Sequence, residues 1–202
     1  MTHFPLFFNL KDKDIIIFGG GHHALQKIKK LKPFEPHLTV ISDCISDDIK
    51  NVGGITFKEQ KFCKTDLDIN PLFVIIAEDE KTTAEIYAAC NHRHIPVNAV
   101  ERLEHYDIIF PSVTASENLC IGISSGGLSP TATVEFKERF ENQIPENTDE
   151  IIEWMPSVKA YVKQTVNAST QKQALREIFK EAIDKNRTLE KYETDGIIKK
   201  FL

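Results

Sequence analysis

The sequence predicts an α/β protein in which a doubly wound parallel sheet is followed by a small α/β region and a helical carboxy-terminal domain. Over about the first 100 residues, short apolar runs alternate with amphipathic segments, as in parallel strands joined by helices. A glycine-rich turn separates the first apolar run from the first amphipathic segment. From Asn147 onward apolar residues recur at helical spacing, which indicates a separate helical part.

The first elements predict a βαβ unit. Residues 14–18 (DIIIF) are a short continuous apolar run, which is typical of a strand buried on both faces of a parallel sheet. A helix is expected from near His22 to just before Pro33, which marks its end. The apolar face of this helix comprises Ala24, Leu25, Ile28 and Leu31. Residues 38–41 (LTVI) predict the second strand, which ends at Ser42 and Asp43.

The alternation continues as far as Glu101. Strands are expected at residues 72–77 (LFVIIA) and 96–100 (PVNAV), with a helix between them that Thr82 or Thr83 opens. Beyond Glu101 the pattern predicts two further strands, at residues 108–111 and 119–123, joined by a turn-rich link.

The remainder of the chain predicts helices. Pro130 suits the first turn of a helix that extends to about Phe140. Three later helices are indicated by apolar stripes, whose members are Ile151, Ile152, Met155, Val158 and Val162; then Ala174, Leu175, Ile178, Phe179 and Ala182; and finally Ile197, Ile198 and Phe201. Trp154 is interpreted as part of this helical core rather than as a platform for a ligand.

The composition indicates a cytoplasmic globular protein. Of its 202 residues 41% are hydrophobic and 27% charged, and the net charge of −5 argues against a nucleic-acid partner. The four cysteines have no CxxC spacing, which fits a reducing compartment. The first ten residues do not read as a signal peptide, and no apolar run approaches the roughly 18 residues of a membrane helix. We therefore expect no membrane association.

The glycine-rich turn carries the main functional prediction. Gly19, Gly21 and Ala24 follow the G-x-G-x-x-A pattern of a Rossmann dinucleotide-binding turn, between a predicted strand and a predicted helix. Asp43 follows at the end of the second strand, where a carboxylate bonds the ribose hydroxyls of NAD and disfavours NADP. The alternative is a structural turn, with Asp43 capping a helix. We predict NAD as the cofactor.

The charged residues near this turn are given simpler roles. His22 and His23 begin the helix, and we expect them to contribute backbone N–H groups to the phosphates. A cluster of lysines on the same helix is interpreted as a solvated face, with contact to an anionic ligand as the alternative; its members are Lys27, Lys29, Lys30 and Lys32.

Several motifs in the same order resemble a known family. They are PLF (5–7), FGGGHHALQK (18–27), LTV (38–40), VNAVE (97–101), IFPS (109–112) and ISSGGLSP (123–130). With these residues the sequence resembles the precorrin-2 dehydrogenase/sirohydrochlorin ferrochelatase family, the amino-terminal part of many siroheme synthases. The resemblance extends from about residue 3 to 145, and more loosely through the helical end. The glycine pair followed by Ser-Pro is its most specific motif.

The resemblance implies a reaction and an organisation. It implies NAD-dependent oxidation of precorrin-2 to sirohydrochlorin, a tetrapyrrole of siroheme biosynthesis, and it leaves open whether Fe2+ is then inserted as a second substrate. It also implies a homodimer and three parts: an NAD-binding Rossmann domain (1–112), a dimerisation and substrate-pocket region (113–145) and a helical carboxy-terminal domain (146–202).

The resemblance also assigns roles to individual residues. Cofactor-binding roles fall on Gly19, Gly21, His22, His23, Asp43, Cys44, Ala77, Glu78 and Asn98, with Ala77 and Glu78 expected beside the nicotinamide. Glu101 takes the place of the family's catalytic aspartate. A glutamate can still accept a proton, but a shift of about 1 Å in a catalytic group can cost on the order of a hundredfold in rate. Of the two activities, metal insertion is the one we expect to be weaker.

A polar turn is the candidate substrate contact. Precorrin-2 carries several carboxylates, which N–H groups, hydroxyls and a helix N-terminus can bind; the residues expected to do so are Ser124, Ser125, Gly126, Gly127 and Ser129. A turn with a purely structural role would need the glycines but not three serines. His92, His94 and His105 are not interpreted as metal ligands.

Two other functions are compatible with the sequence. One is a regulatory module that binds NAD without catalysis. The other is an NAD-dependent oxidoreductase for a different small molecule.

Overall fold

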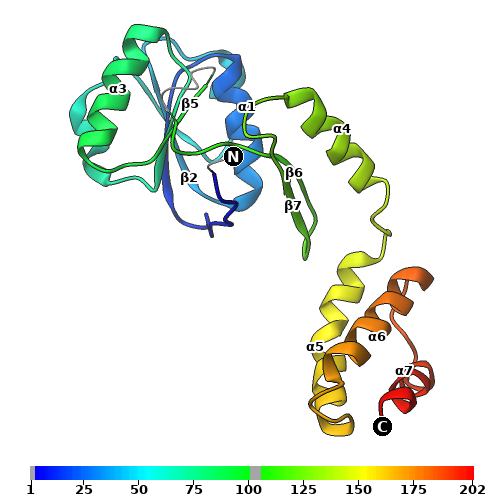
Figure 1. The fold of residues 1–202 in the computed structure, drawn as a ribbon. Coiled ribbons are helices and arrows are strands. Elements are labelled where there is room, and N and C mark those ends of the chain that lie inside the picture. The colour runs from blue at the N-terminus through cyan, green and yellow to red at the C-terminus, as the bar shows by residue number, and fades with distance from the viewer. Residues whose placement is uncertain (1–2, 101–105) are drawn as a thin grey trace. The chain divides into compact units, whose positions relative to one another are not determined.

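The computed structural model describes residues 3–100 and 106–202. The chain divides into two compact units, Met1–Phe110 and Pro111–Leu202, and each is described by itself (Figure 1). The first unit ends two residues before the boundary expected at residue 112. The further division of the second unit at residue 145 stays a prediction.

A parallel sheet forms the centre of the first unit. In the described part of the chain it has five strands in the order β3-β2-β1-β4-β5, namely β1 (Asp14–Phe18), β2 (His37–Ser42), β3 (Thr56–Glu59), β4 (Phe73–Ile76) and β5 (Val97–Ala99). The chain proceeds from β1 through β2 to β3 and then returns to the other side of β1. The direction of winding therefore reverses beside the carboxyl end of β1, where open α/β sheets bind their ligands.

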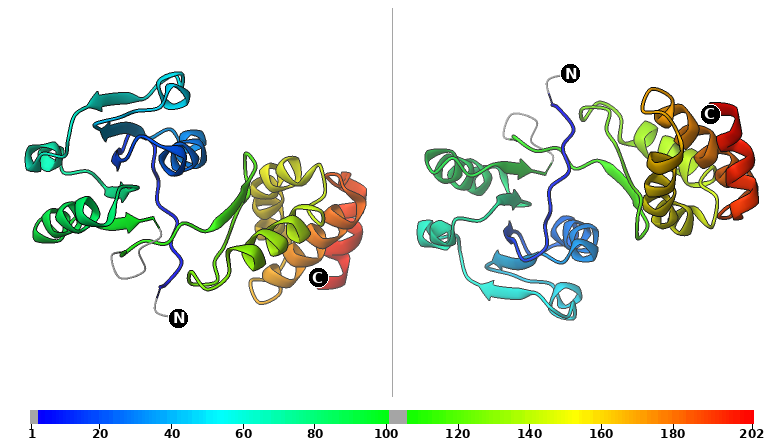
Figure 2. Two further views of the ribbon diagram at one scale, coloured as in Figure 1. Left: turned by 90° about the horizontal axis from the view of Figure 1, so that it is seen from above. Right: turned by 90° about the horizontal axis from the view of Figure 1, so that it is seen from below.

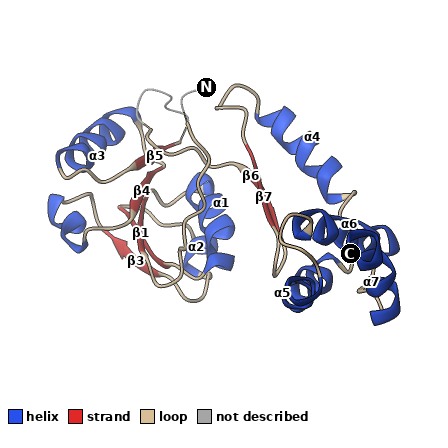
Figure 3. Ribbon diagram, turned by 60° about the horizontal axis from the view of Figure 1, so that its bottom comes forward, coloured by secondary structure: helices blue, strands red, loops and turns tan. Residues whose placement is uncertain are grey.

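Helices cover both faces of this sheet, as predicted (Figure 3). They are α1 (His22–Leu31), α2 (Asp47–Lys50) and α3 (Glu80–His92), with short 3-10 helices at Lys32–Phe34 and Lys64–Ile69. Successive residues of β1 alternate between two cores, because side chains alternate across a strand. Ile15 and Ile17 pack with the buried face of α1, while Ile16 and Phe18 pack on the side of α3.

Local hydrogen bonds explain where the first unit departs from expectation. Helix α3 begins at Glu80 rather than at Thr82 or Thr83, because Asp79 is its N-cap and accepts a hydrogen bond from the Thr82 N–H at 3.0 Å. Strand β3 and helix α2 were not predicted. All four residues of β3 are exposed, so the strand carries no apolar period.

The strand expected at residues 108–111 is absent. The backbone N–H groups of Asp107 and Ile108 both donate to the carbonyl oxygen of Val97, so this segment lies against β5 without continuing as a strand. The strand begins one residue after the expected stretch, at β6 (Ser112–Ala115).

The second unit consists of a hairpin and helices (Figure 2). Strand β6 pairs antiparallel with β7 (Cys120–Ile123), and helix α4 (Pro130–Glu141) follows. The helices expected after Asn147 are α5 (Thr148–Thr165), α6 (Gln171–Lys185) and α7 (Lys191–Ile198), with a last 3-10 helix at Lys199–Phe201. Their core contains the predicted stripes except for Ile152, with Ile151, Val162, Ala174, Ile178 and Ala182 fully buried. Among the described residues, no helix is both long enough and apolar enough to cross a membrane.

A carboxylate of α5 holds the turn of the β6–β7 hairpin. Asp149 Oδ1 accepts hydrogen bonds from the Ser116 hydroxyl (2.7 Å) and the Asn118 backbone N–H (2.8 Å). These bonds, first that of Ser116, lower the pKa of Asp149. A depressed pKa adds stability that is present above the unfolded pKa and is lost as the pH falls through the folded one.

We expect the Asn118 amide resonance to titrate with a midpoint below about 3.9, the ordinary aspartate value. NMR measures this midpoint directly. The Asp149→Asn variant should show no such titration. A midpoint at or above the ordinary value would contradict the role of Asp149.

Candidate dinucleotide-binding site

The first two glycines of the turn are required by packing. Gly19 has φ +125°, and a Cβ there would lie 2.5 Å from the carbonyl oxygen of Ala77. A Cβ at Gly20 would overlap the carbonyl oxygen of Cys44, and the Gly20 oxygen accepts a hydrogen bond from the Ser46 N–H at 2.9 Å. Packing within the turn is therefore enough to explain why glycine occupies these two positions. Gly20 was not among the predicted residues, because the fingerprint leaves its position unspecified.

Gly21 differs from both of its neighbours. Its φ of −101° suits any residue, it is exposed, and a Cβ there would meet nothing within 4 Å. Nothing in the fold therefore requires a glycine at this position. The fingerprint's second glycine exists so that a pyrophosphate can approach the backbone, and the open space at Gly21 fits that requirement.

Gly21 is also the N-cap residue of α1, so the first backbone N–H groups of this helix lie beside it. No side chain caps this helix, its first turn holds no acidic residue, and its first intrahelical bond is donated by Leu25 to Gly21. The N–H groups of residues 22–24 thus precede the hydrogen-bonded ladder, as at any helix start. Together with the positive end of the helix dipole, they suit a diphosphate. The side chains of His22 and His23 are exposed.

The structure brings the predicted ribose-binding residues next to this turn. Asp43 and Cys44 are exposed and directly follow β2. The Gly19 N–H donates to the carbonyl oxygen of Ile41 at 3.0 Å, which fixes the end of β2 beside the turn. Helix α2 has Ser46 as its N-cap, so Asp43 does not cap it.

Glu78 reaches the same edge of the sheet from the other side. The hydroxyl of Ser42, at the end of β2, donates a hydrogen bond to Glu78 Oε1 at 3.1 Å. Burial raises the pKa of Glu78, the Ser42 bond opposes this, and the charges of Asp43 and Asp79 raise it further. The family resemblance places Glu78 beside the nicotinamide, and this stays a prediction. In the structure its side chain bonds Ser42, the last residue of β2, which precedes Asp43.

Asn98 belongs to the next strand, β5. Asn98 is buried, its Nδ2 donates to the carbonyl oxygen of Ile108 at 2.7 Å, and its Oδ1 has no partner in the described part of the chain. Such an acceptor fits a carboxamide N–H. Glu101 itself lies outside the described residues. The preceding residue, Val100, donates its N–H to the carbonyl oxygen of Ile76 at 2.8 Å, at the carboxyl end of β4. The role of Glu101 stays a prediction.

One of the four lysines does not belong to a solvated face. Lys29, Lys30 and Lys32 are exposed, but Lys27 is half-buried, with its Nζ 4.3 Å from the centre of the Phe110 ring. Burial, and to a lesser degree the charge of Lys30, lowers its pKa to about 8. The expectation of a solvated face is therefore wrong for Lys27, because Phe110 covers it.

The serine and glycine turn of the second unit is held by its own hydroxyls. Gly126 and Gly127 have φ of +69° and +86°, which glycine favours. Ser124 Oγ accepts from the Gly126 N–H, Ser125 Oγ from the Ser129 N–H, and Ser129 Oγ caps α4 through the Ala132 N–H. The argument that a structural turn would not need three serines is thus wrong, and their contact with substrate stays a prediction.

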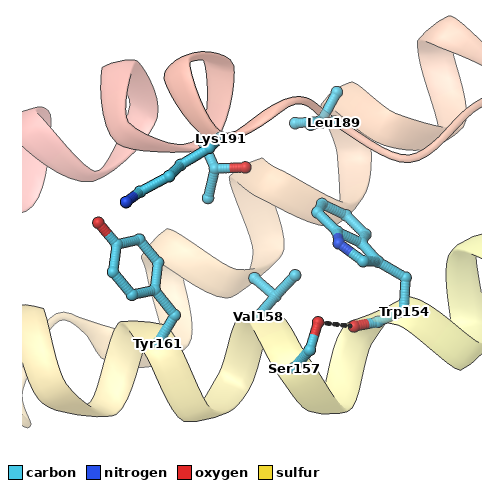
Figure 4. A pocket seen from close by; sticks show the side chains of 7 residues that line it. Trp154, Ser157, Val158, Tyr161, Leu189 and Lys191 are labelled. Atoms are coloured by element: carbon cyan, nitrogen blue, oxygen red, sulfur yellow. Dashed lines mark hydrogen bonds between the residues drawn. The ribbon is translucent and has the colours of Figure 1, made fainter.

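A shallow hollow of about 200 Å³ lies on the helical part of the second unit (Figure 4). Trp154 contacts the helical core, as expected, and is partly exposed at one end of the hollow, with Tyr161 and Lys191 at the other. Over residues 3–100 and 106–202, no three histidine, cysteine or acidic side chains gather as a metal site; His105 lies outside that range.

Together, the winding reversal, the open Gly21 and the exposed Asp43 define a dinucleotide-binding protein of the Rossmann class. The chain belongs to the NAD_binding_7 family, described as "Putative NAD(P)-binding", which matches residues 6–112. This match, with the relatives described next, confirms the family resemblance and NAD as the cofactor.

Curated relatives and a solved structure agree with this assignment. The chain is 29% identical to the siroheme synthase of Psychrobacter arcticus, covering 84% of this chain and 32% of that protein. It is 30% identical to the siroheme synthase of Thioalkalivibrio sulfidiphilus, covering 72% and 30%. The chain thus spans about a third of the length of these relatives. Its fold is similar to that of SirC, a precorrin-2 dehydrogenase, with a TM-score of 0.64, 21% identity and 98% coverage of both chains.

Proposed function

We propose that this protein is an NAD-dependent dehydrogenase that oxidises precorrin-2 to sirohydrochlorin in siroheme biosynthesis. The observation that carries the nucleotide part is Gly21, which the fold leaves open at the point where the sheet reverses its winding. The substrate is proposed from the relatives, which are named siroheme synthase and precorrin-2 dehydrogenase.

The residues of the first unit divide the work as follows. The N–H groups of residues 22–24 hold the diphosphate, Asp43 bonds the ribose hydroxyls, and Asn98 Oδ1 accepts from the carboxamide. Bound NAD+ supplies the hydride acceptor. Glu101 takes up the proton that precorrin-2 loses as its conjugation increases, so that one hydride and one proton leave the substrate together.

In the second unit, the serine and glycine turn is proposed to bind substrate carboxylates. The N–H groups of Gly126, Ser129 and Ala132 already donate to serine oxygens within the turn. The proposed donors to the substrate are therefore the hydroxyl hydrogens of Ser124 and Ser129, helped by the positive end of the α4 dipole. Insertion of Fe2+ is proposed to be the weaker activity, because Glu101 stands where the family has aspartate.

The region 113–145 is proposed to form a homodimer. A two-stranded sheet is only marginally stable alone, and α4 beside it exposes Val134, Phe136 and Phe140. A second copy would cover both the free strand edges and these apolar side chains. We expect light scattering to give twice the mass of the 23.0 kDa chain, and Phe136→Asp to give the monomer. A monomeric wild type would contradict this.

The decisive experiment for the reaction is anaerobic. Purified protein receives precorrin-2 and NAD+, then Fe2+, while absorption follows both NADH and the tetrapyrrole. We expect NADH and sirohydrochlorin in equal amounts before iron is added. Nucleotide binding without consumption of the tetrapyrrole would instead favour a regulatory module.

Cysteine labelling tests the nucleotide site without turnover. Cys44 and Cys63 are exposed, whereas Cys90 is buried and its pKa is raised to about 12, so it stays a protected thiol. We expect NAD+ to slow alkylation of Cys44, measured by mass spectrometry, because the ribose lies over it. Cys63 is the internal control and should react at an unchanged rate. Equal rates at Cys44 with and without NAD+ would place the nucleotide elsewhere.

A further inference from the structure

The side chain of Glu78 extends across the end of the central strand. In the sheet, Phe18 of β1 is paired on one side with Ile41 and on the other with Ile76. Ser42 and Ala77 are the next residues on either side, with Gly19 between them. The hydrogen bond from Ser42 Oγ to Glu78 Oε1 therefore links β2 to β4 over the glycine turn.

This bond uses only part of the carboxylate. Within the described residues, Glu78 Oε2 has no hydrogen-bond partner, and neither Glu78 nor Asp43 forms an ion pair with a lysine, arginine or histidine. Asp43 is close enough to act on Glu78 electrostatically. Two uncompensated carboxylates thus flank the turn, one of them held by Ser42 and the other exposed.

Resting on the proposed function, we propose that Glu78 acts with Asp43 to select NAD over NADP. Each carboxylate can accept a hydrogen bond from a ribose hydroxyl. The 2′-phosphate of NADP adds acceptor oxygens and about two negative charges, so that it meets repulsion from both carboxylates. Lys50, whose charge reaches Cys44, is already paired with Glu59 at 2.6 Å.

A merely structural role predicts a different outcome for a charge-neutral substitution. Glu78→Gln keeps a carbonyl oxygen that can accept the Ser42 hydroxyl, so the link between β2 and β4 survives. Only the negative charge is removed. If Glu78 serves only to join the strands, both nucleotides should bind to this variant as they do to the wild type.

Isothermal titration of NAD+ and NADP+ measures the selectivity directly. The proteins compared are the wild type, Glu78→Gln, Asp43→Asn and, as a matched control, the exposed α3 variant Glu85→Gln. We expect the preference of the wild type for NAD+ to fall about tenfold in Glu78→Gln, mostly through tighter NADP+ binding, and not to change in Glu85→Gln. Added salt should narrow the preference of the wild type more than that of Glu78→Gln, because salt screens the repulsion.

The outcomes separate the two proposals. The role of Glu78 in selectivity is overturned if Glu78→Gln keeps the wild-type preference for NAD+ over NADP+, or if it loses affinity for both nucleotides equally. Either result leaves NAD+ binding by the wild type in place. Absence of heat with either nucleotide overturns the proposed function, and the selectivity with it.

Discussion

Replacing Gly21 by alanine is expected to leave the protein folded and to weaken NAD+ binding at least about tenfold, which corresponds to about 1.4 kcal/mol. A Cβ at Gly21 meets no protein atom within 4 Å, and its φ of −101° is accessible to alanine. Alanine is a poorer N-cap residue than glycine, by about 1 kcal/mol. Replacing a flexible glycine also reduces the entropy of the unfolded chain, which offsets about 0.4–1 kcal/mol of this loss. The new methyl group instead occupies the approach to the N–H groups of α1.

Gly20→Ala is the matched control, because the same methyl group one residue earlier meets backbone. It would overlap the carbonyl oxygen of Cys44, and overpacking of this kind costs about 1–3 kcal/mol or more. Thermal unfolding and calorimetry with NAD+ together distinguish the variants. Gly20→Ala should lower the melting temperature, whereas Gly21→Ala should lose affinity at nearly unchanged stability. If Gly21→Ala binds NAD+ as the wild type does, the open space at Gly21 is not the pyrophosphate site.

The contrast between these glycines shows how far the sequence alone could reach. The fingerprint predicted Gly19 and Gly21 from their spacing, and the apolar runs predicted β1, β2, β4 and β5, because buried parallel strands must be continuously apolar. The pattern could not tell which glycine the fold requires and which it leaves open. That difference depends on how close Ala77 and Cys44 approach, and both contacts come from distant parts of the chain.

The elements that escaped prediction lack an apolar signal or depend on distant partners. All four residues of strand β3 are exposed, so its sequence has no apolar pattern. It is a strand only because its backbone pairs with β2. The apolar stretch near Ile108 resembles a strand, yet its backbone bonds Val97 irregularly. The bond between Ser42 and Glu78 joins residues 36 positions apart, which no local pattern indicates.

Removing the carboxylate of Glu101 is expected to lower the rate of precorrin-2 oxidation by roughly a hundredfold to ten-thousandfold, the usual contribution of a positioned general base. NAD+ affinity should stay within a few-fold of the wild type, because the diphosphate and ribose contacts come from the turn and from β2. Glu101→Ala and Glu101→Gln should agree, since both remove the proton acceptor. Turnover is measured as NADH formation under anaerobic conditions.

Glu101→Asp restores the residue that the family uses and so separates position from chemistry. Because aspartate is also a base, this variant should keep far more activity than Glu101→Ala. A shift of about 1 Å in a catalytic group can cost on the order of a hundredfold in rate. The drop in rate relative to the wild type therefore reports how closely the pocket fits the longer side chain. The rate of iron insertion should rise in Glu101→Asp if the extra methylene of glutamate is what weakens this activity. Full turnover by Glu101→Ala would instead show that another group accepts the proton, even if nucleotide binding at Gly21 stands.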